Sequence, residues 1–402
     1  MSKTKDRSEN MSFTCSYDYK MVKNITSLAG QWPYQKQRTK LLCLSLVTLS
    51  TCSIMAPQIA RFVICSGDLN CILQTLAAYL LTIVTLIKLY TCYFNRYKMK
   101  ILVDQLFIEW DKLKTPEEYE IMKTYAETGK RYTLRYSLCI FISAYIFCSL
   151  SLIPYIMDII LPLNNSRPIL TVTPSYYFID EREYFFYIYS HAIVAWEITV
   201  SGIVAHDCFL LTYIEHICSI FTIIGFRFEQ LMYKHTDTGK ILPSYSSDIY
   251  RKQIAFTVDM HQKVLKFAHL LEDVFSLSLA MQIALNTISI SITLLQITQD
   301  TSDTLIVIRY IVYIAVLLLH LFCLSFEGQK LIDHSLRTRD KIYNSLWYKT
   351  SPKSQKMLLF VMQKTFQPIS LSACKIYIFS MENFTTIMQT SMSYFTVLAS
   401  ME

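Results

Sequence analysis

Seven apolar stretches, each long enough to cross a lipid bilayer, limit what this chain can fold into. About 20 helical residues, rising about 1.5 Å each, cover the roughly 30 Å of a bilayer's hydrocarbon core. Of all residues, 52% are hydrophobic and only 17% are charged, as in proteins that cross a membrane several times. The sequence therefore predicts an all-α polytopic membrane protein with transmembrane helices at about 41–60, 71–92, 136–157, 185–207, 274–297, 304–326 and 376–400.

The segments between these spans alternate in charge, and this alternation predicts their orientation. Lysine and arginine gather in the N-terminal segment and in the segments after the second, fourth and sixth spans. The other segments hold only Arg61, Arg167 and Arg182, among several acidic residues. Because basic segments stay in the cytoplasm, the N-terminus is predicted to be cytoplasmic and the C-terminus extracellular. The glycosylation motif at Asn164 then lies outside and is expected to carry a glycan, whereas the motif at Asn24 lies inside.

The cytoplasmic segments are expected to be helical. Apolar residues recur every three or four positions in 101–110, 117–130, 249–272 and 326–347, which predicts that the spanning helices continue into the cytoplasm and pack on one another as an assembly platform. Residues 356–367 predict a short amphipathic helix that Pro368 ends, and the outside segment 161–184 predicts an ordered cap over the helix ends. The expected organisation is a cytoplasmic segment at 1–38, six helices with a ligand-binding outer half at 39–326, the anchor region at 327–374, and the last helix with the extracellular C-terminus at 375–402.

The outer halves of the second, third, fourth and sixth spans are rich in aromatic and small polar side chains. Such a wall suits a small, mostly apolar ligand, because rings give contact area without demanding exact hydrogen-bond geometry. Packing in the core or at the membrane interface is the alternative for each residue. The candidate ligand-binding residues are Leu76, Tyr79, Leu80, Ile83, Phe147, Ser151, Tyr155, Tyr187, His191, Ala195, Trp196, Tyr310 and Tyr313.

A few ionisable residues lie inside the apolar stretches. Lys88 is near one end of its span and is expected to extend its ammonium group to the interface. His206 and Asp207 are interpreted as a polar helix end, with a metal site or proton relay as the less favoured alternative. Glu197 lies mid-span and is either a neutral packing residue or part of a cavity wall. Of the twelve cysteines, Cys65 and Cys71 flank an outside loop, and a disulfide between them is one interpretation.

The sequence lacks the motifs of common enzyme sites. It contains no glycine-rich phosphate loop, no GxSxG and no HExxH motif, and its cysteines lack metal-ligand spacing. We therefore expect no catalytic residues, no cofactor, no resident metal and no nucleic-acid partner.

The last apolar stretch is unusually polar for a membrane helix. A helix that faces lipid on all sides gains nothing from so many hydroxyl and amide groups, so something other than lipid is expected to face them. At helical spacing one stripe is wettable until it reaches Val397. This stripe consists of Thr386, Thr390, Ser393 and Val397, followed by Ser400 or Met401.

The C-terminal fifth of the chain resembles the signature of insect odorant receptors, an inverted seven-helix family, and is most similar to receptors of ants, bees and wasps. The matching positions are Phe322-Cys323, Glu327-Gly328-Gln329, Trp347-Tyr348, Pro352, Gln355-Lys356, Pro368, Lys375-Ile376-Tyr377, Glu382-Asn383-Phe384 and Ser393-Tyr394-Phe395-Thr396-Val397-Leu398. Upstream of His320 the likeness is one of segment lengths and topology. The charge at Glu402 departs from the terminus of the co-receptor type.

The resemblance implies an odorant receptor subunit of a ligand-gated, nonselective cation channel. It implies a heterotetramer with the odorant receptor co-receptor, joined by the cytoplasmic helices, in the plasma membrane of olfactory neuron dendrites. It further implies that Thr386, Thr390 and Ser393 line the pore, that Val397 is the gate, and that Ser400 and Met401 lie at the outer mouth. The ligand pocket of the family lies among the second, third, fourth and sixth helices. Two alternatives stay open: a homomeric channel of the gustatory type, and a receptor that signals through a cytoplasmic partner.

Overall fold

The computed structural model describes residues 19–161, 167–236, 244–299 and 304–400. The chain begins with a short helix, two long helices and a further helix: α2 (Lys20–Leu28), α3 (Gln37–Cys65), α4 (Leu69–Phe94) and α5 (Arg96–Asp111). It continues with α6 (Pro116–Ser149), the 3-10 turn η1 (Leu150–Leu152), α7 (Ile153–Ile160), α8 (Phe185–Thr236), α9 (Ser244–Gln299) and α10 (Thr304–Tyr343). It ends with η2 (Trp347–Lys349), α11 (Pro352–Lys364), the two-stranded β1 (Ser372–Ala373) and β2 (Tyr377–Ile378), and α12 (Met381–Ser400).

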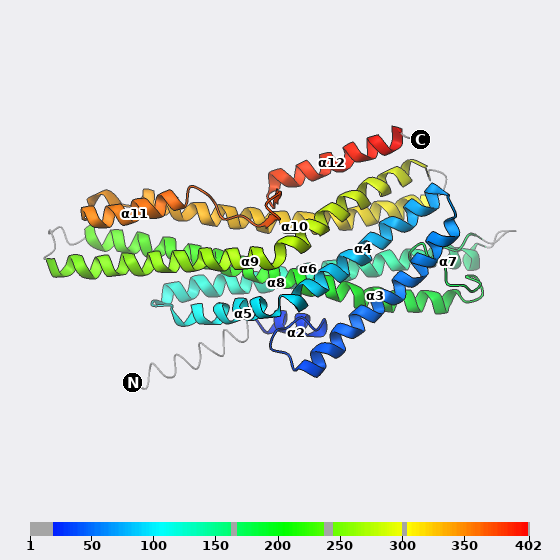
Figure 1. Cartoon of the computed structure of the whole chain (residues 1–402), viewed down its shortest axis with the longest axis horizontal. Coiled ribbons are helices and arrows are strands. Elements are labelled where there is room, and N and C mark those ends of the chain that lie inside the picture. Colours follow the sequence, from blue (N-terminus) through cyan, green and yellow to red (C-terminus); the bar gives the residue numbers. More distant parts are fainter. Residues whose placement is uncertain (1–18, 162–166, 237–243, 300–303, 401–402) are drawn as a thin grey trace.

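The long helices confirm the predicted all-α polytopic architecture. Among the described residues, six helical runs are long and apolar enough to cross a membrane: α3, α4, the α6–α7 run Pro116–Ile160, α8, α9 and α10. The seventh predicted span is α12, which has 20 residues and is more polar than the apolar stretches of these six runs. It runs along the end of the bundle that also holds α3 and α4 (Figure 1).

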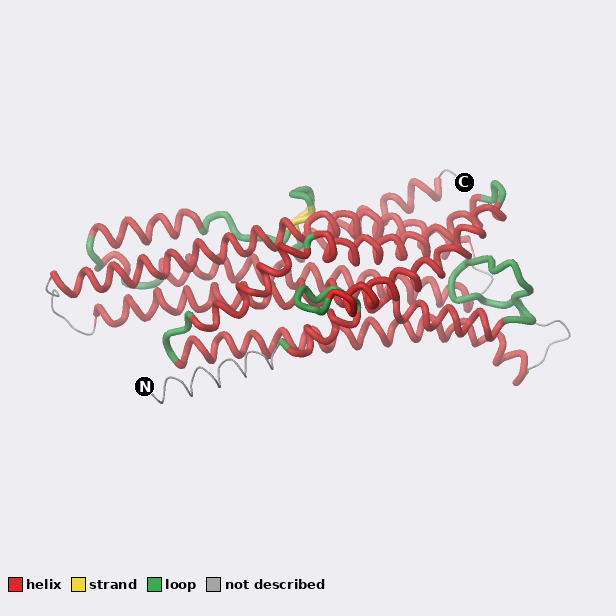
Figure 2. The backbone as a smooth tube through the Cα atoms, turned by 60° about the horizontal axis from the view of Figure 1, so that its bottom comes forward, coloured by secondary structure: helices red, strands yellow, loops and turns green. Residues whose placement is uncertain are grey.

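The opposite end of the bundle is built by helices that continue far beyond membrane length. α8 has 52 residues, α9 has 56 and α10 has 40, and Figure 2 shows them extending side by side with α11 into one elongated half. A large cluster of buried apolar side chains fills this half, including Met122, Phe221, Phe275 and Leu358. The predicted continuation of the spans into a packed helical platform is therefore confirmed, with α10 ending at Tyr343 rather than continuing to Trp347.

Local sequence signals explain where the platform helices begin. Thr115 accepts a hydrogen bond from the backbone N–H of Glu118, and Ser351 accepts one from Ser354, so both act as N-caps. Pro116 and Pro352 follow directly, in the first helical position that proline tolerates. The expectation that Pro368 ends the short helix is wrong, because α11 already ends at Lys364.

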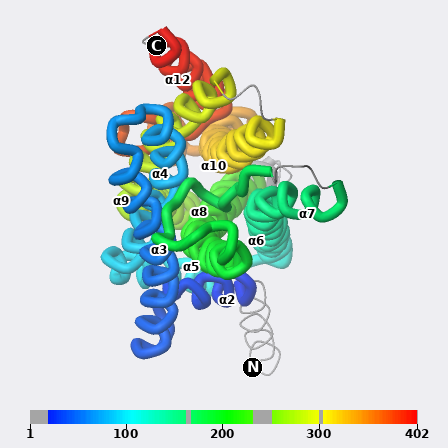
Figure 3. Tube along the Cα trace, turned by 90° about the vertical axis from the view of Figure 1, so that its right-hand side faces the viewer, coloured from blue at the N-terminus to red at the C-terminus, as the bar shows by residue number. Residues whose placement is uncertain are grey.

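α8 is the central helix of the molecule. Of the residues in the most apolar 18-residue stretch of α8, 89% are buried, compared with 22–56% in the corresponding stretches of the other five spans. Viewed along the bundle, α8 lies in the middle of the other helices (Figure 3). A helix that is apolar on all faces is expected to be surrounded by protein, and this position lets α8 present side chains to several helices at once.

Of the segment 161–184, which was predicted to form an ordered cap, residues 162–166 lie outside the described residues, and residues 167–184 contact α3 and α10 as a cap. The backbone N–H of Tyr176 donates to the carbonyl oxygen of Pro57 at 2.9 Å, and the guanidinium of Arg309 donates to the carbonyl oxygens of Thr171, at 2.7 Å, and Val172. A disulfide between Cys65 and Cys71 closes the turn between α3 and α4. Asn164, the predicted glycan site, lies outside the described residues.

The segment before α12 docks tightly on α10. Phe379 is fully buried, and a Cβ atom placed on Gly328 would lie 2.3 Å from its carbonyl oxygen. No residue with a side chain fits at that position without displacing the segment. The small β1–β2 hairpin precedes this contact, with Cys374 and Lys375 at positive φ in its turn. Gly328 therefore sets how closely the base of the last helix approaches the bundle.

Candidate functional site

Two cavities follow one another along α10 in the half of the bundle under the cap. The outer cavity has a volume of about 190 Å³ and the inner one about 100 Å³. Both are well above the roughly 10–15 Å³ that one water molecule needs. The two cavities share four wall residues, Ala78, Phe147, Thr173 and Tyr313. They are therefore neighbouring compartments of one region.

The walls of the two compartments differ in polarity. The outer cavity is bounded by α3, α4, α6, α9, α10 and the cap, and its polar wall residues include Arg61, Gln74, Glu181, Gln296 and Arg309. The inner cavity is almost entirely apolar and lies among α4, α6, α8 and α10. Its wall consists of Leu81, Ile140, Ser143, Ala144, Cys148, Trp196, Val200, Ile203, Val316, Leu317 and His320, besides the four shared residues.

Four of the sequence-predicted ligand residues lie in these walls. Phe147, Tyr310 and Tyr313 line the outer cavity, and Phe147, Trp196 and Tyr313 line the inner one. The Tyr313 hydroxyl donates to the carbonyl oxygen of Ala77 at 2.9 Å, which holds its ring between the compartments.

The other predicted ligand residues lie elsewhere. Ser151 and Ala195 are buried in the protein, and Tyr187 is 75% exposed. Tyr155 stacks on Phe185, with ring centroids 5.6 Å apart. His191 lies 3.1 Å from the hydroxyl of Ser53.

On α4 the cavity face is opposite to the predicted one. The predicted residues Leu76, Tyr79, Leu80 and Ile83 line neither cavity, whereas Gln74, Ala77, Ala78 and Leu81 do. At 100° per residue the two sets point about 180° apart. Two adjacent alanines are the sequence signal that was missed, because small side chains leave space where larger ones fill it.

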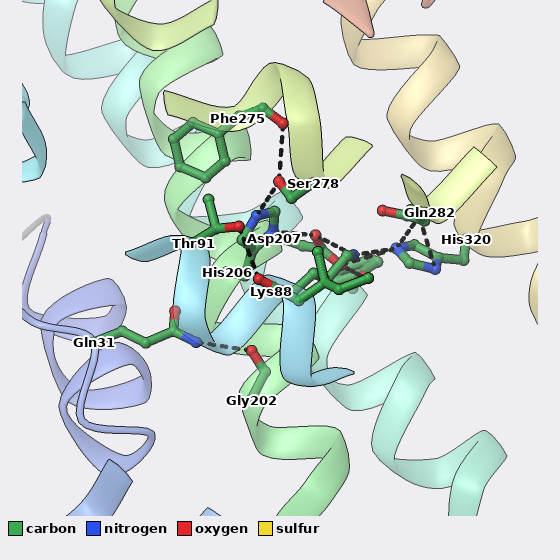
Figure 4. A network of polar contacts seen from close by, with 12 residues as sticks. Gln31, Lys88, Thr91, Gly202, His206, Asp207, Phe275, Ser278, Gln282 and His320 are labelled. Atoms are coloured by element: carbon green, nitrogen blue, oxygen red, sulfur yellow. Dashed lines mark hydrogen bonds and ion pairs between the residues drawn. The ribbon is translucent and has the colours of Figure 1, made fainter. Parts of the chain in front are cut away.

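An ionic cluster, drawn in Figure 4, adjoins the inner cavity through His320, which belongs to both. The ammonium group of Lys88 on α4 is 2.6 Å from a carboxylate oxygen of Asp207 on α8, and His320 on α10 is 2.8 Å from the other oxygen. The hydroxyl of Tyr136 on α6 donates to Asp207 at 2.6 Å, and His206 lies 2.9 Å from it. Side chains from four helices therefore converge on one buried carboxylate.

The cluster corrects two sequence interpretations. Lys88 was expected to reach the interface but is 0% exposed, and His206 and Asp207, interpreted as a polar helix end, are also 0% exposed. A lysine remains ionised at such depth only if a counter-charge is adjacent, and Asp207 supplies it.

Among the described residues, no group of three or more His, Cys, Asp or Glu side chains is arranged to hold a metal ion. Glu197 lines neither cavity, and one of its carboxylate oxygens has no hydrogen-bond partner among the described residues.

The predicted polar stripe of α12 faces away from the bundle. Ile387 and Ser391 are the buried residues of α12, and the Ser291 hydroxyl of α9 donates to the Ser391 carbonyl oxygen at 3.0 Å. Thr386, Ser393 and Ser400 are exposed, Thr390 is half-buried, and Val397 is 55% exposed. The hydroxyls of Thr390 and Ser393 donate to carbonyl oxygens of their own helix, which leaves their oxygen atoms facing outward as acceptors. Met401 lies outside the described residues.

Known proteins share this fold. The structure of the insect olfactory receptor OR5 from Machilis hrabei in complex with eugenol superimposes with a TM-score of 0.76, covering 98% of this chain and all of that one at 13% identity. A second structure of the same receptor gives a TM-score of 0.74 at 15% identity, covering 95% of this chain and 97% of that one. At this identity the likeness establishes the fold.

Sequence relatives agree with the fold. Odorant receptor 13a of Drosophila melanogaster is 25% identical over 215 residues, half of each chain, and the odorant receptor coreceptor of the same species is 22% identical over 38% of this chain and 31% of its own length. The chain spans about half the length of the first curated relatives it matches. A family model described as 7tm Odorant receptor matches residues 68–392, which hold the ionic cluster, the first part of α12 and all the helices that bound the two cavities except α3. This match covers more than half of the chain. The chain therefore belongs to the 7tm odorant receptor family, which is a family of receptors and not of enzymes.

Proposed function

We propose that this protein is an odorant receptor subunit that binds a small volatile in its two cavities and gates a nonselective cation channel formed with the odorant receptor co-receptor. The observation that carries the proposal is the pair of adjacent compartments under the cap of a family-typical bundle. Their walls are mostly apolar and aromatic, with a few polar groups, as in sites that bind small molecules. The channel acts in the plasma membrane, as a heterotetramer in olfactory neuron dendrites.

α9 supplies a direct connection between the ligand and the last helix. Thr293 and Gln296 of α9 line the outer cavity, and Ser291, two residues away, bonds to Ser391 of α12. A ligand that fits the cavity better in one position of α9 therefore favours one position of α12. Ligand binding shifts the equilibrium only as far as the affinities for the closed and open states differ.

The exposed stripe of α12 supplies the pore wall in this proposal. In a tetramer the stripe faces the central axis, where the hydroxyl oxygens of Thr386, Thr390 and Ser393 meet water and cations. Val397 forms the gate, because an apolar ring in a narrow pore excludes water when closed. Ser400 and Met401 lie at the outer mouth.

Current recordings test the proposal. The chain is expressed with a co-receptor, alone, or with an unrelated membrane protein, and volatile compounds are applied to whole cells and to excised patches. We expect ligand-evoked cation current only with the co-receptor. Current from the chain alone would identify a homomeric channel instead, and a response lost on patch excision would identify signalling through a cytoplasmic partner.

A further inference from the structure

The outer cavity holds hydrogen-bond donors that lack acceptors. Arg309 is 7% exposed and Gln296 is 2% exposed, and both line the cavity. The amide nitrogen of Gln296 is buried and has no hydrogen-bond partner among the described residues, and the same holds for Nε of Arg61. A buried donor without an acceptor is costly, so an acceptor that enters this cavity gains binding free energy there.

Arg309 has donor capacity beyond the bonds it makes to the cap. A guanidinium carries five N–H groups, and the bonds to the described residues run from two of its nitrogens to the carbonyls of Thr171 and Val172. The guanidinium carbon lies 5.1 Å from the ring centre of Phe147, and both side chains belong to the cavity wall. Glu181 supplies the carboxylate in this wall, and it interacts electrostatically with Arg61. The side of the cavity at Arg309 therefore favours oxygen acceptors over cationic groups.

The wall of the inner cavity is almost entirely apolar, and the inner cavity adjoins the outer one along α10. Along α10, Arg309 and Tyr313 border the outer cavity, and Tyr313, Val316 and His320 border the inner one. From Arg309 to His320 the helix rises about 16 Å at about 1.5 Å per residue. The two compartments together form a polar head region and an apolar tail region.

We propose that the preferred ligand is an elongated amphiphile: an aliphatic chain that occupies the inner cavity and ends in a carbonyl or carboxylate oxygen at Gln296 and Arg309. The inference rests on the proposed function, since it names the ligand class of the same site. The shared chemistry is an oxygen acceptor at the end of the chain. A plain hydrocarbon leaves the buried donors unpaired, and a primary ammonium adds a charge beside Arg309.

A ligand series of equal chain length tests the head region. The alkane, methyl ester, carboxylic acid and primary amine of one chain length are applied to cells that express the wild-type chain with a co-receptor. We expect the ester or the acid to give half-maximal current at a concentration at least tenfold below that of the alkane and the amine. A comparison of ester and acid across pH separates a neutral carbonyl from a carboxylate as the preferred head.

A matched pair of variants tests Gln296 itself. Gln296→Leu removes an amide nitrogen that has no hydrogen-bond partner among the described residues, so folding is expected to be retained. Gln58→Leu makes the same change at a buried glutamine, 0% exposed, which lines neither cavity and whose amide nitrogen and oxygen find no partner in the described part of the chain. We expect Gln296→Leu to weaken the ester or acid response about three- to tenfold and leave the alkane response unchanged, and Gln58→Leu to change neither.

A third variant tests the tail region. Ala144 lines only the inner cavity, so Ala144→Leu is expected to shorten the longest chain that activates while shorter members still act. Equal responses to alkane and ester, or equal effects of Gln296→Leu and Gln58→Leu, would overturn the inference and leave the proposed function standing. Absence of any ligand-evoked current from a surface-expressed wild-type chain with its co-receptor would remove the proposed function and this inference with it.

Discussion

Asp207 is the residue on which the membrane half of the molecule converges. A fully buried carboxylate is costly, and its cost is offset here by an ammonium group, a tyrosine hydroxyl and two imidazoles at 2.6–2.9 Å. Those groups come from α4, α6, α8 and α10. Gln282 of α9 lies 3.3 Å from His320 and connects a fifth helix. Such a network specifies one relative placement of the helices, because any other leaves a buried charge unpaired.

Removal of one partner of the central ion pair is expected to be far more harmful than removal of both. Lys88→Met leaves the Asp207 carboxylate buried without its ammonium partner, at a cost of about 3–5 kcal/mol. The double variant Lys88→Met with Asp207→Asn removes both charges. We expect surface expression and thermal stability in detergent to fall sharply in the single variant and to recover in large part in the double one. Equal losses in both variants would contradict the assignment of Lys88 and Asp207 as a pair.

Val397 is the residue expected to control leak. It is 55% exposed on the outward stripe of α12, where an apolar constriction in a tetramer would exclude water. Val397→Ala widens and weakens such a constriction, so basal current with a co-receptor is expected to rise by about tenfold, the order that loss of two methyl groups suggests. Met392→Ala, at a 50% exposed position off the stripe, is the control. Unchanged leak and ion selectivity in Val397→Ala would argue against this gate.

At the scale of elements, the base of α12 is held by a close approach to α10. Gly328→Ala would place a methyl group 2.3 Å from the carbonyl oxygen of Phe379, a backbone atom that cannot move alone. We expect the variant to displace the base of α12 and to lose ligand-evoked current, at normal or reduced surface level. Gly129→Ala is the matched control on α6, because its nearest neighbour is a side-chain atom of Glu215, at 3.3 Å, and not a backbone atom. Normal currents in Gly328→Ala would show that α12 does not depend on this contact.

α4 shows which part of an element can be predicted. Its existence and extent follow from hydropathy, but its cavity face was predicted as Tyr79 and Ile83, whereas Ala77, Ala78 and Leu81 line the cavities. Periodicity identifies the facing stripe of a helix only when one side meets solvent. α4 packs against α3, α8 and α9, so apolar side chains are suitable on all its sides. The position of empty space depends on the shapes of those neighbours.

At the scale of the whole molecule, the predicted orientation can be tested by glycosylation. With the cap outside, Asn164 is expected to carry a glycan, and Asn164→Gln should abolish the mass shift that a glycosidase produces. Asn24 lies on α2, whose Val22 packs in the apolar cluster of the platform, so Asn24→Gln should leave the shift unchanged. A glycan lost only in Asn24→Gln would reverse the orientation of every span.

The sequence by itself determined the helical class, the positions of the spans, the platform helices and, through its C-terminal motif, the family. These properties depend on neighbours along the chain: hydropathy over 20 residues, periodicity over two turns, and a cap next to its helix. Only the tertiary structure decided that Lys88 pairs with Asp207, 119 residues away, and that Gln296 and Arg309 share a cavity wall with Arg61. The physical reason is that an ion pair or a cavity forms between helices, and a lysine or an alanine in an apolar stretch carries no record of which distant side chain will face it.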